Sequence, residues 1–144
     1  MRILGIDYGE KRIGLALTDP EAILAYPYAT LVKSTRDKLF ADLAEVLDKE
    51  GVECIVLGLP VDLDGTETLI TRQVRNFAAS LARRTEIPIH LADERLSTQA
   101  AMDDLAASGM SRKQKKAVVD QQAAVRILES WMARNRQDTA GGQA

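Results

Sequence analysis

The sequence predicts an α/β fold in one domain, with a mixed five-stranded sheet flanked by helices. Three short apolar segments separated by turn residues open the chain, a pattern typical of an antiparallel meander. Two further apolar segments alternate with segments of helical periodicity, which is typical of parallel strands joined by crossover helices. The length of 144 residues, 46% of them hydrophobic, fits a single globular domain with a substantial core.

The meander begins with a hairpin of two strands, expected over residues 3–6 and 13–17. Both segments are largely apolar, as in strands that are buried on both faces, and Gly14 permits close backbone approach. The third strand is expected over residues 25–32. Pro27 places this strand at an edge of the sheet, because proline cannot donate a ladder hydrogen bond.

The rest of the chain alternates helices with strands. Capping residues and apolar stripes predict the helices, and short apolar runs predict the strands. The expected elements are a helix from Ser34 or Thr35 to about Glu50, a strand over 54–57, a helix from about Thr66 to Arg84, a strand over 87–92, a helix over 98–108 and a helix from Ser111 to about Arg134. The folded domain is thus predicted over residues 1–135, with a disordered tail over 136–144, which lacks periodicity.

Composition argues against several classes of protein. A formal net charge of −2 does not suit a protein that coats nucleic acid by bulk electrostatics. No apolar run approaches the length of a membrane span and no secretory signal opens the chain, so we expect a cytoplasmic protein without membrane contact. Cys54, the single cysteine, is expected to be an inert buried thiol, and His90 a core histidine.

Asp7 is the first candidate for chemistry because it lies where the first apolar strand ends and a turn begins. A carboxylate in that position loses hydration, so it needs hydrogen-bond donors, a cation or a proton. The alternative is an Asx-turn, in which Asp7 only caps its own hairpin. Right-handed crossovers would place the strands ending at Asp7, Leu57 and Ala92 parallel and adjacent, so that their carboxyl ends share one crevice.

Three further acids are candidates for the same crevice. Asp93 and Glu94 follow the fifth strand, and strand alternation lets only one of them face a given side, without choosing between them. Glu94 has the longer reach. Asp120 lies on the apolar stripe of the last helix, where a carboxylate is costly unless it reaches a partner. The alternative for Asp120 is an ion pair with Lys116 within the helix.

The expected chemistry follows from the charge of these acids. If Asp7, Glu94 and Asp120 converge, each pair at about 4 Å repels by roughly 4 kcal/mol at an effective dielectric constant of about 20. Such a cluster needs cations, and oxygen ligands without His or Cys favour Mg²⁺ or Mn²⁺ over zinc. Acidic clusters with these ions catalyse phosphoryl transfer. The residues by themselves therefore predict a nuclease or a phosphohydrolase.

Four motifs follow one another along nearly the whole domain. They are Gly5–Gly9 with Arg12–Ala16, Gly58–Pro60 with Asp64–Thr66, Asp93–Thr98, and Asp120 with Ala123–Ala124 and Ile127–Leu128. In combination these motifs are highly specific, and the chain resembles the YqgF family, also called RuvX. The resemblance implies a ribonuclease H-like fold and a metal-dependent endonuclease that cleaves phosphodiester bonds.

The resemblance also implies roles for individual residues. It implies that Mg²⁺ or Mn²⁺ is bound by the catalytic residues Asp7, Glu94 and Asp120, with Asp93 as a reserve ligand. Phosphate contacts are expected from Lys11, Arg12, Arg95, Lys113 and Lys116, and from backbone N–H groups at the start of the helix near Thr66.

The family carries two labels, pre-16S rRNA nuclease and Holliday junction resolvase, so the substrate stays open between them. We favour 5′-end maturation of precursor 16S rRNA over cleavage of branched DNA, which would need a homodimer rather than a monomer. A non-catalytic ribosome-assembly factor that binds nucleic acid is a further alternative. With 4% aromatic residues, recognition through backbone and shape is favoured over base stacking.

Overall fold

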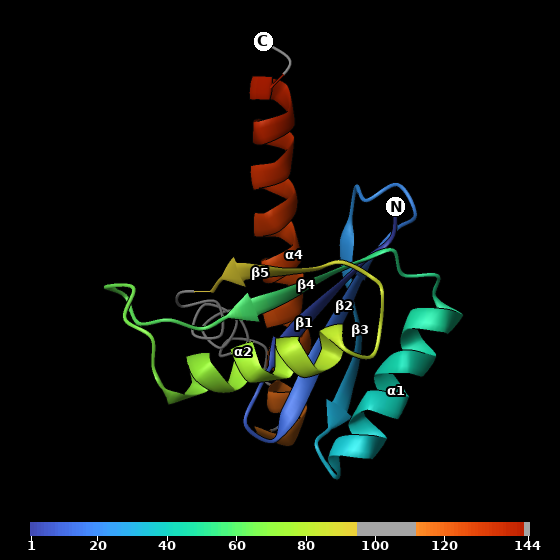
Figure 1. The fold of residues 1–144 in the computed structure, drawn as a ribbon, viewed down its shortest axis with the longest axis vertical. Coiled ribbons are helices and arrows are strands. Elements are labelled where there is room, and N and C mark those ends of the chain that lie inside the picture. The colour runs from blue at the N-terminus through green and yellow to red at the C-terminus, as the bar shows by residue number, and fades with distance from the viewer. Residues whose placement is uncertain (95–111, 143–144) are drawn as a thin grey trace.

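The sheet of the computed structural model, which describes residues 1–94 and 112–142, contains five strands in the order β3-β2-β1-β4-β5. The strands are β1 (Ile3–Tyr8), β2 (Arg12–Thr18), β3 (Ala25–Val32), β4 (Cys54–Leu59) and β5 (Ile89–Asp93). The first three are antiparallel neighbours, whereas β4 is parallel to β1 and β5 is parallel to β4 (Figure 1). The predicted mixed five-stranded sheet is confirmed, with β3 at an edge.

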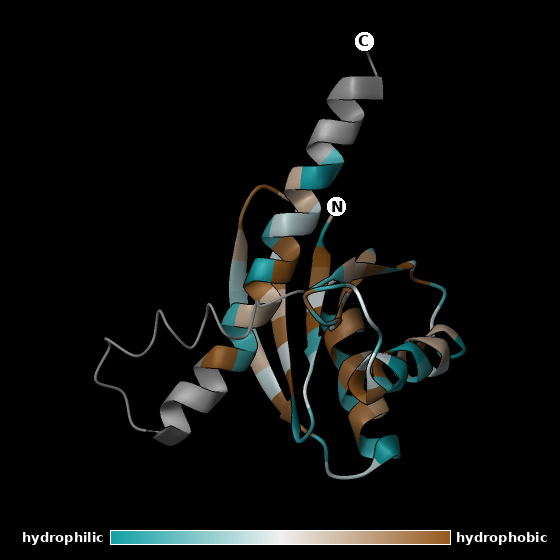
Figure 2. Ribbon diagram, turned by 90° about the vertical axis from the view of Figure 1, so that its left-hand side faces the viewer, coloured by the Kyte–Doolittle hydropathy of each residue, from teal (hydrophilic) through white to brown (hydrophobic). Residues whose placement is uncertain are grey.

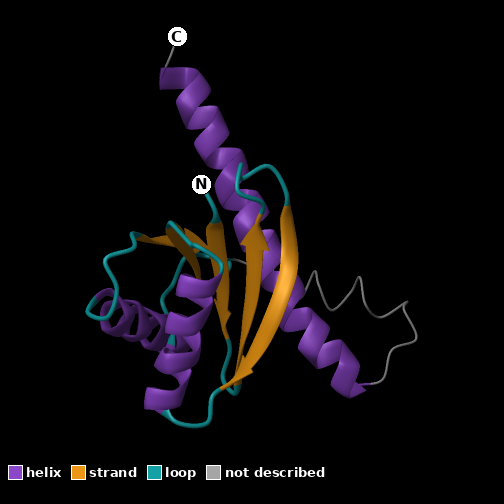
Figure 3. Ribbon diagram, turned by 90° about the vertical axis from the view of Figure 1, so that its right-hand side faces the viewer, coloured by secondary structure: helices purple, strands orange, loops and turns teal. Residues whose placement is uncertain are grey.

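The described helices lie on opposite faces of this sheet. They are α1 (Arg36–Lys49), α2 (Leu69–Ala82) and α4 (Arg112–Gly142). Helices α1 and α2 cover one face, and α4 crosses the other (Figures 1 and 3). Thr35 caps α1, because its side chain accepts a hydrogen bond from the backbone N–H of Lys38. The predicted helix over 98–108 lies outside the described residues.

Two apolar clusters separate the three layers. The first joins the sheet to α1 and α2 and contains Leu4 and Ile6 of β1, both fully buried. The second joins the sheet to α4 and contains Ile3 of β1 with Leu128 of α4. Alternate residues of one strand thus enter different clusters, as the period of two requires. Figure 2 shows hydrophobic residues along the strands and on the helix sides that face them.

Helix α2 is shorter than predicted at both ends, since it begins at Leu69 rather than near Thr66 and ends at Ala82. The backbone N–H of Thr66 donates to Asp64 Oδ1 at 2.9 Å, so an Asx-turn occupies the predicted first turn. The helix instead begins after Thr68, which forms a capping box with Thr71. Helix α4 continues past Arg134, its predicted end, to Gly142. The predicted disorder of residues 136–144 stays a prediction.

Two single-residue predictions have different outcomes. Cys54 is buried, and burial raises the pKa of its thiol, as expected of an inert cysteine. The prediction of a core histidine is wrong, because His90 is exposed and its ring packs against Trp131 with centroids 5.3 Å apart. Within the part of the chain that the structure describes, no helix is long and apolar enough to cross a membrane.

Candidate active site

Asp7 lies near the carboxyl end of β1, on the face of the sheet that α4 covers. It pairs with Gly14 of β2 in the antiparallel ladder. A Cβ atom at Gly5 would collide with Leu128 of α4, so Gly5 faces α4. Because residues two apart on a strand share a face, Asp7 faces α4 as well. Asp7 is only 8% exposed. The strand thus holds a carboxylate in the layer between the sheet and α4.

Glu94 reaches the same layer from the end of β5. Ala92 belongs to the apolar cluster under α4, and Glu94 follows it in the alternation. Glu94 is 8% exposed, whereas Asp93 is exposed at the surface. The question that alternation in the sequence left open is therefore answered, since Glu94, and not Asp93, shares the layer with Asp7.

A glycine on the intervening strand makes room for Glu94. Gly58 of β4 pairs with Ala92 of β5, and a Cβ atom at Gly58 would collide with the Glu94 carboxylate and with Ile127 of α4. Sequence analysis placed Gly58 in a motif but did not assign it this role. The available signal was a glycine within a strand pattern, which often marks a close approach of another group.

Asp120 comes from α4 and is held by an ion pair. The Arg12 Nε donates to Asp120 Oδ2 at 2.9 Å, and the two side chains are 34% and 17% exposed. Below Asp120, a Cβ atom at Gly14 would overlap the Asp120 carbonyl group, so the glycine lets α4 lie directly on β2. The prediction that Asp120 faces the sheet is confirmed, and its observed partner is Arg12.

Burial and charge raise the pKa values of the two buried acids. Desolvation raises the pKa of Asp7 to about 6, although a hydrogen bond with the Glu94 side chain lowers it and the charge of Asp120 adds to the rise. Desolvation also raises the pKa of Glu94 well above its usual value, assisted by the charge of Asp7 and by their shared hydrogen bond. Burial and mutual repulsion thus favour the protonated forms of both carboxyl groups.

The donor set fits a cation that prefers oxygen. Glu94 Oε1 is buried and has no hydrogen-bond partner among the described residues, so an acceptor is available beside the Asp7 carboxylate. Asp7 and Glu94 supply only carboxylate oxygens, the ligands that Mg²⁺ and Mn²⁺ prefer. No group of three acidic, His or Cys side chains in the described residues is arranged to hold an ion. The present geometry thus offers two carboxylates, with Asp120 held by Arg12.

The predicted phosphate-binding residues fall in different places. Arg12 reaches the acidic cluster through Asp120, and Lys11 is exposed in the turn between β1 and β2. Thr66 lies in the loop between β4 and α2 rather than at a helix start, so the structure does not place its N–H group at the N-terminus of α2. Arg95 and the side chains of Lys113 and Lys116 lie outside the described residues. All six phosphate contacts stay predictions.

Comparison with known proteins assigns the chain to a family. The model of the RuvX family, described as Holliday junction resolvase, matches residues 1–134. The chain belongs to the RuvX family. A RuvX relative from Maridesulfovibrio salexigens, named "Putative pre-16S rRNA nuclease", is 54% identical over 134 residues, covering 93% of this chain and 99% of the relative. A relative of the same name from Oleidesulfovibrio alaskensis is 52% identical over 132 residues, or 92% of each chain.

Solved structures show which fold this RuvX chain has. T. thermophilus RuvC in complex with a Holliday junction substrate matches with a TM-score of 0.56 at 16% identity, over 93% of this chain and 95% of that one. The fowlpox virus Holliday junction resolvase matches with a TM-score of 0.57 at 13% identity, over 93% and 99%. The predicted ribonuclease H-like fold is confirmed by these neighbours.

Proposed function

We propose that this chain is a metal-dependent endonuclease that cleaves phosphodiester bonds at the site of Asp7, Glu94 and Asp120. The observation that carries the proposal is the buried pair of Asp7 and Glu94, with Glu94 Oε1 left without a partner. Two carboxyl groups with raised pKa values in a desolvated layer are typical of functional sites, because such an arrangement is unfavourable for folding alone.

In the proposed mechanism, Asp7 and Glu94 would hold the ion, and Asp120 would be a third ligand. A bound divalent ion supplies charge to the scissile phosphate and lowers the pKa of water. Both carboxylates would bind the cation in their ionised forms, so any proton that burial favours on the pair would be released on binding. Arg12 is partly exposed beside Asp120, and its guanidinium can turn to a phosphate oxygen when Asp120 takes up a ligand role.

The favoured substrate is precursor 16S rRNA, cleaved in the maturation of its 5′ end. The support is the name, pre-16S rRNA nuclease, that is given to relatives more than half identical over nearly the whole chain. Cleavage of a Holliday junction in branched DNA is the second candidate. It is supported by the description of the family model and by the fold shared with two resolvases. A monomer suits the first substrate, and a homodimer suits symmetric cleavage of the second.

The test is cleavage of a precursor 16S rRNA 5′ leader and of a four-way DNA junction, side by side, with Mg²⁺, with Mn²⁺ and with a chelator. We expect cleavage of the RNA with either ion and none with the chelator. Asp7→Asn and Glu94→Gln should abolish the reaction, because each removes a charged ligand. The matched control is Asp93→Asn, which changes the neighbouring acid on the exposed side of β5 and should retain activity.

Other results of the cleavage assay would contradict the proposed site or favour one of the alternative functions. Cleavage that survives Asp7→Asn or the chelator would contradict the proposed site. Cleavage of the junction alone, by a dimer in solution, would establish the second candidate. Nucleic-acid binding without cleavage, unaffected by Mg²⁺ and by Asp7→Asn, would instead establish a ribosome-assembly factor without catalytic activity.

A further inference from the structure

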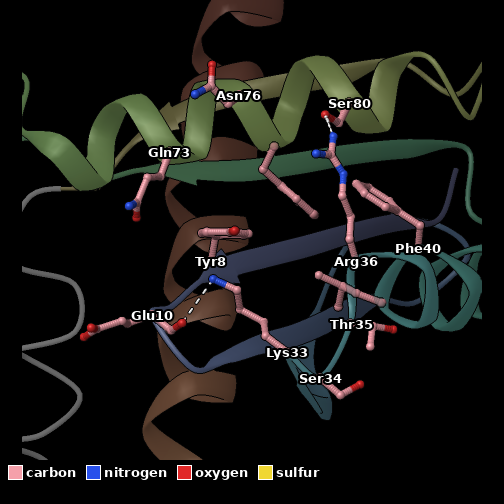
Figure 4. Close-up of a pocket in the computed structure, with 12 residues that line it drawn as sticks. Tyr8, Glu10, Lys33, Ser34, Thr35, Arg36, Phe40, Gln73, Asn76 and Ser80 are labelled. Atoms are coloured by element: carbon pink, nitrogen blue, oxygen red, sulfur yellow. Dashed lines mark hydrogen bonds between the residues drawn. The ribbon is translucent and has the colours of Figure 1, made fainter.

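A pocket opens on the face of the sheet opposite Asp7 and Glu94. It has a volume of about 500 Å³ and lies between α1, α2 and the end of β1. Its residues come from three distant parts of the chain, and the labelled ones include Tyr8, Lys33, Arg36, Phe40, Gln73 and Asn76 (Figure 4). We propose that this pocket, which the nuclease site does not use, binds a nucleoside phosphate.

The floor of the pocket is aromatic. The rings of Tyr8 and Phe77 lie with centroids 4.6 Å apart, and those of Phe40 and Phe77 are stacked at 5.5 Å. Phe40 and Phe77 are buried, and the guanidinium carbon of Arg84 lies 4.1 Å from the Phe40 ring centroid, so the partly exposed ring of Tyr8 is the aromatic surface that a ligand can reach. A planar heterocycle can stack on Tyr8 once the Lys33 ammonium, which now lies over that ring, moves aside.

Two cations at the pocket have no acidic partner among the described residues. Lys33 Nζ donates to the carbonyl oxygens of Gly9 and Glu10 at 3.1 Å and lies 4.0 Å from the Tyr8 ring centroid. Arg36 donates to the Ser80 hydroxyl. Neither cation forms an ion pair with a carboxylate in the part of the chain that the structure describes. Two uncompensated positive charges in a concave site favour an anionic ligand.

The anion is expected at the Arg36 end of the pocket. The one carboxylate of the lining, on Glu10, points away from Arg36 in Figure 4, so it does not oppose a charge there. The guanidinium of Arg36, the first residue of α1, extends away from that helix to the Ser80 hydroxyl in the last turn of α2 (Figure 4).

Two amide side chains of α2 belong to the lining of the pocket. Gln73 and Asn76 are three residues apart on one helix face, both exposed and both in the lining. An amide carries donors and an acceptor together, which matches the edge of a nucleobase and adds nothing specific for inorganic phosphate. The ring of Tyr8, the two amides and the two cations together thus favour a ligand in which a base is joined to a phosphate. The pocket volume lies within the usual range for ligand sites.

The ligand chemistry has two possible sources, a free nucleotide and one nucleotide of a single strand. The proposal does not rest on nuclease activity, because the pocket and the acidic pair lie on opposite faces of the sheet. Binding is therefore measured directly, by calorimetry of the full chain with adenosine, guanosine, cytidine and uridine monophosphates in the presence of a chelator. Ribose 5-phosphate and inorganic phosphate serve as ligands that lack the base.

Three variants test whether the nucleoside phosphate binds in this pocket. Arg36→Gln should weaken binding about tenfold, because it removes one charge-assisted contact. The double variant Gln73→Ala with Asn76→Ala should also weaken it while leaving the cations in place. Arg72→Gln is the matched control, since Arg72 is exposed on α2 outside the lining and its loss should leave binding unchanged. Melting temperatures verify that each variant is folded.

The proposal predicts saturable binding of at least one nucleoside monophosphate, at least about tenfold tighter than binding of either ligand without a base. Absence of saturable binding would overturn it. So would equal binding of inorganic phosphate, or an affinity that Arg36→Gln and the double amide variant leave unchanged. Displacement of the mononucleotide by a five-nucleotide RNA would assign the pocket to a strand, and failure of the RNA to compete would assign it to a free nucleotide. Both of these results would support binding of a nucleoside phosphate in the pocket.

Discussion

The two faces of the sheet differ sharply at the end of β1, where consecutive residues have opposite surroundings. Asp7 enters the layer under α4, in which two buried carboxyl groups meet and one oxygen has no partner among the described residues. Tyr8 enters the layer under α2, where Lys33 and Arg36 border a pocket without an acidic partner in the described chain. We therefore propose a cation as the ligand of one face and an anion as the ligand of the other.

The packing of the two faces differs as well. Under α4 the strands carry glycines that bring the helix backbone close, and at Gly14 no space remains for a methyl group. Under α1 and α2 large side chains such as Leu43 fill the gap. The α4 face can thus hold short, fixed distances between main-chain and acidic groups, whereas the opposite face leaves an open pocket at its end.

The largest effect on stability is expected from removing a large side chain on the α1 and α2 face, or from adding a methyl group at a glycine on the α4 face. Leu43→Ala should destabilise the protein by about 3 kcal/mol because it removes buried apolar surface and leaves a cavity. Gly14→Ala should destabilise it by a similar amount for the opposite reason, since the added methyl group overlaps the Asp120 carbonyl. Urea unfolding measures both changes.

The control for Gly14→Ala is Gly51→Ala. Gly51 has φ of 62° and open space around its Cβ position, so this change adds backbone strain without overlap and should cost about 1 kcal/mol. If Gly14→Ala is no more costly than Gly51→Ala, the close approach of α4 to β2 is not a constraint on the fold.

The next effect is electrostatic and concerns the acidic face alone. Burial raises the pKa of Asp7 to about 6 and that of Glu94 well above its usual value. Both acids therefore bind protons more tightly in the folded state, and stability should fall as pH rises from about 4 through 6. Glu94→Gln should remove much of this slope and stabilise the protein without metal at pH 8 by about 1–2 kcal/mol.

Urea unfolding in the presence of a chelator, at several pH values, measures this slope. Glu86→Gln, at an exposed position, is the control and should leave the slope as in the unaltered chain. A slope that persists in Glu94→Gln would mean that the acids of the α4 face do not govern the stability of the protein at neutral pH.

Most of the fold and the candidate acids of the site could be predicted from the sequence, whereas the partners of those acids could not. Apolar runs of four to eight residues between turn residues locate strands reliably, which is why the five strands were found. The start of α2 was misplaced because Thr66 and Thr68 are both acceptable caps, and the Asx-turn of Asp64 decides between them.

The partners within the site depend on contacts between distant residues. Asp93 and Glu94 differ by one position, and only the register of β5 against β4 determines which faces α4. Arg12 and Asp120 are separated by 108 residues, so no spacing rule could pair them. The pocket was missed for the same reason, because Tyr8, Arg36 and Gln73 are brought together only by the packing of α1 and α2.

A smaller effect should separate the ligands of the two faces. Mg²⁺ or Mn²⁺ at ten times its dissociation constant should stabilise the protein by about 1.4 kcal/mol, raising the melting temperature by a few degrees. Asp7→Asn should lose this increase because it removes a ligand, and Arg36→Gln, on the opposite face, should keep it. An equal increase in Asp7→Asn would place the stabilising ion elsewhere.

The smallest effect is expected from the ion pair between Arg12 and Asp120 at the edge of the acidic face. Because Arg12 is 34% exposed, solvent screens the pair, and it should contribute about 0.5 kcal/mol or less to stability. A double-mutant cycle with Arg12→Gln and Asp120→Asn measures the coupling by urea unfolding. A coupling of 2 kcal/mol or more would show that Arg12 is fixed on Asp120 and cannot turn to a phosphate. A small coupling would leave Arg12 able to exchange the Asp120 carboxylate for a phosphate, as the proposed function requires.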